Sequence, residues 1–120
     1  MKIRKEQMEA FSEAAVKDFE DRVLQDLQEF YPVECRALKE AGVRAIIRKG
    51  IKNAEKYKIV AEHDVCLYID LMFMLGEDFD TDARIPWAEA ILTDQPEDPT
   101  AKIERLYDTA DDYLSEAGKE

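Results

Sequence analysis

Three aspartates and a glutamate give one short stretch of this chain the spacing of a cation-binding loop. The stretch "LGEDFDTDARIPWAE", residues 75–89, contains Asp78, Asp80, Asp82 and Glu89. In the calcium loop of a helix–loop–helix hand, carboxylates at the first, third, fifth and twelfth positions supply hard oxygen ligands around one ion. The four acids fall on these positions, so a calcium-binding sensor is one functional hypothesis.

The sixth position of that loop argues against calcium. A hand needs glycine there for a turn with positive φ, and Ala83 costs roughly 1 kcal/mol in that conformation. Pro86 is typical of a helix start, which draws the ninth position into a first helical turn. We therefore favour a connector in which Asp80 or Asp82 caps the short helix and the other acids lie in solvent. We expect no bound metal and no cofactor.

The sequence offers few other reactive groups. His63 precedes Cys66 by three residues, and Cys35 is the only other thiol. Structural zinc needs four ligands, and a Cys–His nucleophile needs an oxyanion-binding turn and a third orienting group. We therefore interpret His63 as an exposed residue at a helix start, and we expect reduced cysteines with Cys66 buried. A hydrolytic carboxylate pair stays open as a third hypothesis, although the spacing singles out no pair.

The elements that would position these groups are all predicted to be helices. Apolar residues recur every three or four positions, and no strand pattern interrupts them. We predict helices over 6–30, 34–39, 43–57, 62–76 and 86–92, and a last helix opened by Asp98 and Pro99. We expect the aromatic side chains to pack in the core rather than form a ligand site: Tyr31, Tyr57, Tyr68, Tyr107, Tyr113 and Trp87.

The helix at about 62–76 is expected to be central because "VCLYIDLMFML" is apolar on nearly all sides. Gly76 is a plausible end for it, and Gly50 on an apolar stripe predicts close approach of a neighbouring helix. A chain of 120 residues with 46% hydrophobic residues suffices for one core. The sequence predicts one all-α domain, residues 1–120, built as a compact bundle of five to six helices.

Charge is distributed unevenly along the chain. Residues 1–60 carry 13 basic and 11 acidic side chains (+2), whereas 61–120 carry 4 and 17 (−13), giving the net charge of −11. Such a surface repels phosphate backbones and anionic lipids, so we expect neither nucleic acid nor membrane as a partner. One predicted helix is basic, and we expect it to pair with the acidic last helix or with an acidic partner: Arg44, Arg48, Lys49, Lys52, Lys56 and Lys58.

The middle third of the chain resembles a family of small, largely uncharacterised bacterial helical proteins often found beside type VI secretion genes. The resemblance rests on Gly50, Ile51, Ala54, Tyr57, Asp64, Val65, Tyr68, Leu71 to Gly76, Asp78 to Asp80, Asp82, Pro86, Trp87 and Ala88. The chain departs from the family pattern at Lys58, where glycine is usual, and at Ala83, where proline is common. A proline there excludes a positive-φ turn, so the resemblance implies a rigid connector anchored by Phe79 and Trp87.

The resemblance implies a cytoplasmic secretion accessory, and the absence of an N-terminal apolar stretch agrees with that compartment. We therefore predict a non-enzymatic protein-binding partner of a secreted effector or spike-associated protein, acting as an adaptor, chaperone or immunity protein. An acidic surface suits recognition of a basic polypeptide. The residues expected to bind the partner are Glu104, Asp108, Asp111, Asp112, Glu77 and Asp78.

Overall fold

The described parts of the chain are helical throughout. A computed structural model describes residues 13–94 and 98–118, and within them no strand occurs. The elements are α2 (Glu13–Phe30), α3 (Pro32–Lys56), α4 (Glu62–Leu75), the short 3-10 helix η1 (Phe79–Thr81), α5 (Pro86–Leu92) and α6 (Pro99–Gly118). The predicted all-α bundle is confirmed. The predicted start of the first helix, with Met8 and Phe11 on its apolar stripe, lies outside the described residues.

Helices α2 and α3 meet at a sharp corner. Pro32 cannot continue α2 and instead occupies the first turn of α3, leaving Tyr31 between the two helices. Within α3 the backbone is non-helical at Lys39, where φ is 65° and ψ is 168°. The predicted short helix at 34–39 and the following basic helix are therefore the two arms of one kinked element.

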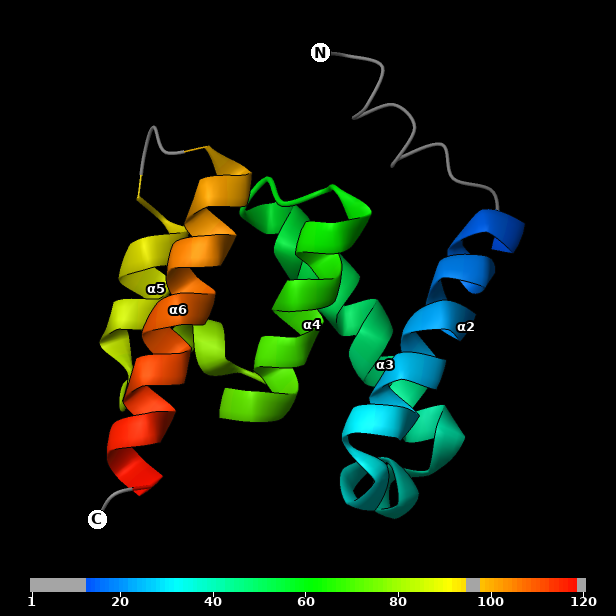
Figure 1. The fold of residues 1–120 in the computed structure, drawn as a ribbon. Coiled ribbons are helices and arrows are strands. Elements are labelled where there is room, and N and C mark those ends of the chain that lie inside the picture. Colours follow the sequence, from blue (N-terminus) through cyan, green and yellow to red (C-terminus); the bar gives the residue numbers. More distant parts are fainter. Residues whose placement is uncertain (1–12, 95–97, 119–120) are drawn as a thin grey trace.

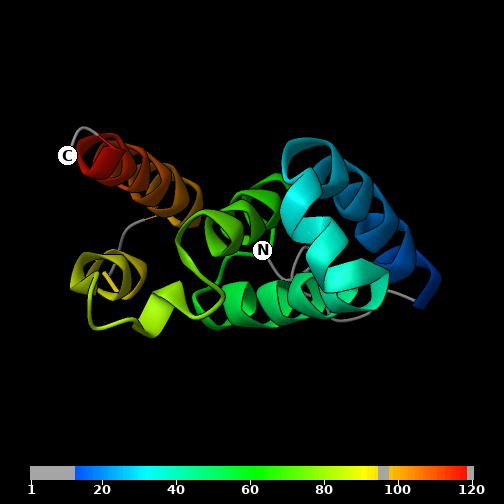
Figure 2. The ribbon, with the colours of Figure 1, turned by 90° about the horizontal axis from the view of Figure 1, so that it is seen from below.

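Helix α4 lies at the centre of the bundle, as its sequence predicts. Figure 1 shows α4 between the α2–α3 pair and the α5–α6 pair, and Figure 2 shows the same order from below. Its buried side chains include Val65, Ile69 and Leu71, which are fully covered. Gly76 ends the helix with φ of 128°. Side-chain-bearing residues rarely adopt this conformation, so glycine suits the position.

Gly50 allows α3 and α4 to approach closely. A Cβ atom at this position would lie 2.6 Å from Ile69 Cγ1 and 3.0 Å from Met72 Sδ, both of α4. These separations are shorter than van der Waals contact, so no side chain fits without movement of α4. The close approach expected at Gly50 is confirmed.

The connector between α4 and α5 is fastened to the core by Phe79, which is fully buried and packs against Tyr68 with ring centroids 5.0 Å apart. Trp87 at the start of α5 packs against Tyr113 of α6. Pro86 occupies the first turn of α5, as predicted, but the residue before the helix is Ile85 and no side chain caps it. The predicted cap by an aspartate is therefore wrong.

Helix α6 begins as the sequence predicts. Asp98 accepts a hydrogen bond from the Ala101 amide through Oδ2 at 3.2 Å. This bond satisfies one of the free amides of the first helical turn. Thr100 then donates its hydroxyl to the buried Asp64 of α4 at 2.7 Å. The apolar side of α6, which includes Ile103 and Leu106, packs against α4 and α5.

The basic side chains of α3 pair with acids of α2 and of the connector. Glu20 of α2, 1% exposed, accepts hydrogen bonds from Arg44 at 2.7 Å and from Arg48 at 2.6 Å. Lys49 binds Glu77 and Asp78. Helices α3 and α6 do not pack against each other over the described residues. The predicted pairing of this basic helix with the acidic last helix is therefore wrong.

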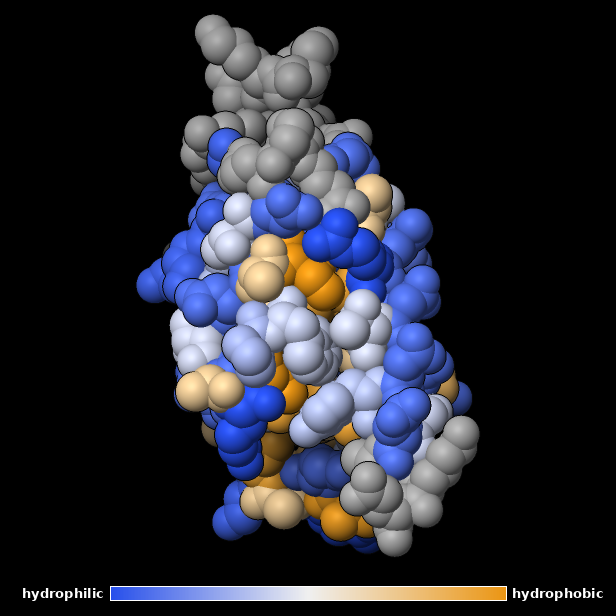
Figure 3. Space-filling view, turned by 90° about the vertical axis from the view of Figure 1, so that its left-hand side faces the viewer, coloured by the Kyte–Doolittle hydropathy of each residue, from blue (hydrophilic) through white to orange (hydrophobic). Residues whose placement is uncertain are grey.

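None of the helices in the described ranges combines the length and the apolar character that crossing a bilayer requires. Figure 3 shows the end of the molecule formed by α5 and α6, where hydrophilic side chains cover most of the surface. Hydrophobic side chains show only in a narrow seam on this face.

Candidate functional site

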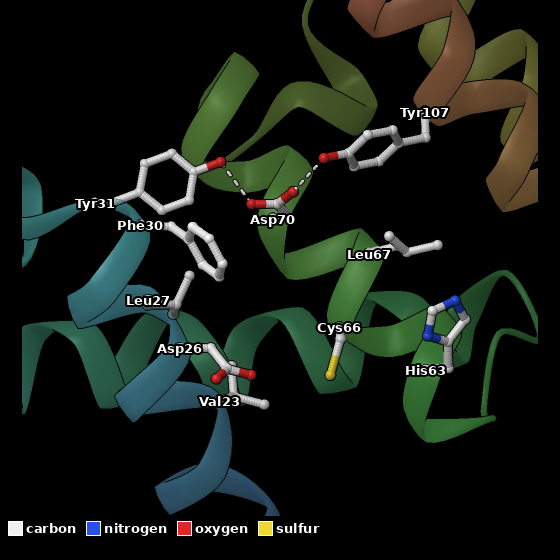
Figure 4. Close-up of a pocket in the computed structure, with 10 residues that line it drawn as sticks. All are labelled: Val23, Asp26, Leu27, Phe30, Tyr31, His63, Cys66, Leu67, Asp70 and Tyr107. Atoms are coloured by element: carbon white, nitrogen blue, oxygen red, sulfur yellow. Dashed lines mark hydrogen bonds between the residues drawn. The ribbon is translucent and has the colours of Figure 1, made fainter.

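A groove of about 620 Å³ runs between α2 and α4. Its residues come from three helices, because Tyr107 of α6 reaches it from the far side of α4 (Figure 4). A second hollow of about 410 Å³ shares Val23, Asp26, His63 and Cys66 with the first and extends it toward Phe19. The two hollows are therefore neighbours along α2 and α4.

The groove exists because α2 packs along α3 for much of its length and touches α4 only briefly. The sides that α2 and α4 turn toward each other therefore stay partly uncovered. Apolar groups line much of this space, with Val23 and Leu27 from α2 facing Leu67 from α4. Phe30 stands at the edge with 72% of its surface exposed. Aromatic side chains of this size are more often buried, so the exposure of Phe30 sets it apart.

One carboxylate at the groove end accepts hydrogen bonds from two tyrosines. Tyr31 donates its hydroxyl to Asp70 Oδ1 at 2.5 Å, and Tyr107 donates to Asp70 Oδ2 at 2.6 Å. Figure 4 shows the carboxylate between the two rings. Because a carboxylate has about four acceptor positions, two remain after these bonds. The tyrosines fix the orientation of Asp70 without using all its capacity to bind a donor.

The same contacts keep both tyrosines protonated. The hydrogen bond to Asp70 and burial raise the pKa of Tyr107 to about 12. Burial, followed by the hydrogen bond to Asp70, raises the pKa of Tyr31 well above its ordinary value. Both hydroxyls therefore act as donors throughout the neutral range. The charges of Asp111 and Glu34 contribute to these shifts, which places further acids near the two rings.

The thiol in the groove lacks the properties of a nucleophile. Burial, with smaller contributions from Asp26 and Glu62, raises the pKa of Cys66. Burial likewise raises the pKa of Cys35, which does not line the groove. The reactive form of cysteine is the thiolate, so both shifts oppose reactivity. His63 is exposed, as predicted, whereas Cys66 is only partly buried.

The acids predicted to bind a partner divide into two groups. Four lie exposed on α6, and none has an ion pair with another described residue: Glu104, Asp108, Asp111 and Asp112. Glu77 and Asp78 are also exposed, but Lys49 Nζ lies 2.8 Å and 2.6 Å from their carboxylates. The connector acids are thus paired with a cation of the same chain, whereas no described residue forms an ion pair with the α6 acids.

The four acids of the possible calcium loop have different surroundings. Asp78 binds Lys49, Asp82 binds Arg84 at 2.8 Å, and Glu89 is exposed on α5. Asp80 is 3% exposed and accepts the hydroxyl of Tyr57 at 2.8 Å, so the expectation that it caps a helix or lies in solvent is wrong. Across the described ranges, no three His, Cys, Asp or Glu side chains are placed to hold a metal ion.

Hydrogen bonds from Arg84, first from its side chain and then from its backbone, lower the pKa of Asp82 to about 2. This carboxylate is therefore engaged by a neighbour two residues away. An ion at the connector would have to displace Arg84 from Asp82 and Lys49 from Asp78. The geometry gives no support to the calcium alternative.

Sequence reasoning missed the groove and the role of Asp70 in it. Tyr31 and Tyr107 pack against the core, as the sequence predicts, but their hydroxyls also donate hydrogen bonds to one carboxylate, which the sequence analysis does not predict. One signal was present, since Asp70 is the only charged residue within the apolar run "VCLYIDLMFML". A lone acid in such a helix needs hydrogen-bond donors from other elements.

Comparison of the chain with protein-family models, with curated proteins and with solved structures found no match in any of the three. The resemblance to proteins found beside type VI secretion genes therefore stays a prediction from the sequence.

Proposed function

We propose that this chain is a non-enzymatic protein-binding accessory of a secreted bacterial effector, an adaptor, chaperone or immunity-type partner. One observation carries the proposal: Glu20 of α2 and the connector acids Glu77 and Asp78 are paired with cations of the same chain, whereas the exposed acids of α6 have no ion pair with a described residue. Glu20, for example, binds two arginines, whereas Asp108 and Asp112 on α6 are exposed without an ion pair among the described residues.

A concentration of unpaired charge favours association with a partner of the opposite sign. Charged surfaces speed the encounter with a basic protein, and salt weakens this effect because it screens exposed charges. A basic toxin or a basic effector segment fits such a surface. Nucleic acid and anionic membranes do not, because the chain carries a net charge of −11.

The chemistry of the groove also favours binding over catalysis. The pKa of the Cys66 thiol is raised, and the Asp70 carboxylate is held by two hydroxyl groups. A hydrolytic nucleophile instead needs an adjacent base that removes its proton. The groove is suited to hold a ligand in place. The cytoplasmic, secretion-associated setting comes from the sequence resemblance, and the binding role agrees with it.

The test is co-purification of the tagged chain from the bacterium that produces it. We expect a basic protein to be retained at low salt and released at high salt. Reversal of three α6 charges, Asp108→Lys, Asp111→Lys and Asp112→Lys, should abolish retention and leave the circular dichroism spectrum unchanged. A matched variant with three reversals elsewhere, Glu29→Lys, Glu55→Lys and Glu89→Lys, makes the same change in net charge at exposed positions.

Specific loss of the partner in the α6 variant supports the proposal. Equal retention by both variants would exclude α6 as the binding surface. Recovery of no partner in any salt condition would contradict the proposed function itself.

A further inference from the structure

We propose that the groove between α2 and α4 binds a basic amphipathic helix of the partner, with one lysine or arginine of that helix against Asp70. This inference rests on the proposed function and specifies the chemistry of its partner. Three observations carry it: the shape of the groove, its charge and the way in which Asp70 is held.

The shape of the groove suits a short helix. It follows α2 from Phe19 to Phe30. At a helical rise of roughly 1.5 Å per residue, this part of α2 is about 16 Å long, which is also the length of about three turns of a docked helix. An apolar strip formed by Val23, Leu27 and Leu67 can cover the apolar face of such a helix, the arrangement found in helix-in-groove recognition.

The charge of the groove selects a basic ligand. Asp26 and Asp70 line it, and the carboxylates of Glu34 and Asp111 are close enough to affect Tyr31 and Tyr107 at its end. The cation at the opposite end, Arg22, is already paired with Asp18 and Glu62. The groove therefore has an excess of negative charge, which is concentrated at the Asp70 end.

Asp70 is arranged to receive a cationic side chain. Hydrogen bonds from Tyr31 and Tyr107 hold its carboxylate in one orientation, so little side-chain entropy is lost when a donor binds. The unused acceptor positions suit an ammonium or guanidinium group. Phe30 and Tyr31 at the same end offer aromatic faces, which also attract cations.

The same charge argues against a second copy of this chain as the occupant. Two chains of net charge −11 repel each other, and a dimer through this groove would bring acidic rims together. A basic helix of another protein instead gains both apolar burial and charge neutralisation. Charge complementarity therefore favours a different protein.

The test uses fluorescence anisotropy with a panel of labelled helical peptides, each of about 14 residues, or roughly four turns. All members share one apolar leucine face and differ in the position of a single lysine. We expect at least one register to bind the full chain, and Asp70→Asn to weaken that binding by about tenfold. Phe30→Ser, a change at an exposed position, should weaken binding as well. Glu55→Gln, which removes one charge outside the groove, should have no effect.

Several outcomes would overturn the proposal. Failure of every peptide to bind, or equal binding by the wild type and Asp70→Asn, excludes the groove as a basic-helix site. Sedimentation that shows a dimer broken by Phe30→Ser would assign the groove to a second copy. Binding seen only after deletion of residues 1–12 would assign it to the chain's own N-terminal segment.

Co-purification separates this inference from the proposed function. Loss of the cellular partner in both the α6 variant and the groove variants supports both proposals. Loss in the α6 variant alone leaves the function standing and contradicts the groove as its docking site.

Discussion

Tyr31 donates its hydroxyl to Asp70 at 2.5 Å across 39 residues of sequence. The bond joins the corner between α2 and α3 to the central helix α4. Tyr107 of α6 binds the other oxygen of the same carboxylate, so Asp70 connects both ends of the bundle to α4. The side chain that we propose to bind a partner therefore also joins three parts of the fold.

Removal of the Tyr31 hydroxyl should measure this contribution. Tyr31→Phe keeps the aromatic ring but leaves Asp70 Oδ1 without its donor, and we expect a loss of about 1–2 kcal/mol in the free energy of unfolding. Urea denaturation followed by circular dichroism gives the value. Tyr113→Phe is the matched control, because Tyr113 is 43% exposed and its hydroxyl has no hydrogen bond to a described residue. Equal effects of the two changes would show that the Tyr31–Asp70 bond adds no stability.

Gly50→Ala should destabilise the protein even though alanine favours helix. The propensity gain is about 1 kcal/mol. The new Cβ, however, would lie 2.6 Å from Ile69 Cγ1. We expect a net loss of about 1–3 kcal/mol, measured by thermal unfolding. In an Ile69→Ala background the same change should cost less, because the clashing atom is absent. A stabilised single variant would contradict the close packing of α3 on α4.

The sequence predicts the helix limits in this region because the signals are local. Gly76, Pro86 and Asp98 each act on their own backbone or on the next helical turn. The helix ends that they define can therefore be predicted from the neighbouring residues alone. The pairing of Arg44 with Glu20 involves two residues 24 positions apart, and no local signal distinguishes this acid from those of α6. The groove is harder to predict from the sequence than this ion pair.

The groove depends on how far α2 diverges from α4, which is a property of packing and not of either helix alone. Tyr31, Asp70 and Tyr107 come from three separate segments, and their meeting follows from the same packing. The exposed acids of α6 could be predicted because they recur on the polar side of one helix. Among the connector acids, Glu77 and Asp78 are exposed, as the sequence predicts. Asp80 is buried instead, because it accepts a hydrogen bond from Tyr57, which is distant in the sequence.

Lys39→Gly should stabilise the protein. Lys39 has φ of 65° and ψ of 168°. Glycine enters this region readily, whereas other residues adopt it at a cost. We expect a gain of about 1 kcal/mol in the free energy of unfolding. Lys52→Gly, at an exposed helical position of the same element, should instead lower the free energy of unfolding by about 1 kcal/mol. Loss of stability in both variants would show that Lys39 is not strained.

Glu20 should give the protein part of its resistance to acid. Burial would raise the pKa of this carboxyl, but hydrogen bonds from Arg48 and Arg44 outweigh burial and lower the pKa below 4.5. A lowered pKa in the folded state means that the stabilisation is complete above pH 4.5 and is lost as the pH falls through the folded value. At pH 7, Glu20→Gln should cost about 2 kcal/mol.

The difference between the wild type and Glu20→Gln should shrink as the pH falls below 4.5, because protonation removes the same charge from the wild type. Urea denaturation of both proteins at a series of pH values between 7 and 3 measures this difference in the free energy of unfolding. Glu29→Gln, at an exposed position without an ion pair to a described residue, is the matched control. A difference that stays constant over this pH range would contradict the role of the Glu20 charge.

The most direct test of the binding account is chemical-shift mapping of the isotope-labelled chain with the partner recovered by co-purification. We expect the perturbed amides to cluster along the groove, around Leu27 and Asp70, and along the exposed face of α6, around Asp108 and Asp111. We also expect added salt to reverse these chemical-shift changes. Shifts confined to the last turns of α3, around Glu55, which does not line the groove, would contradict this expectation.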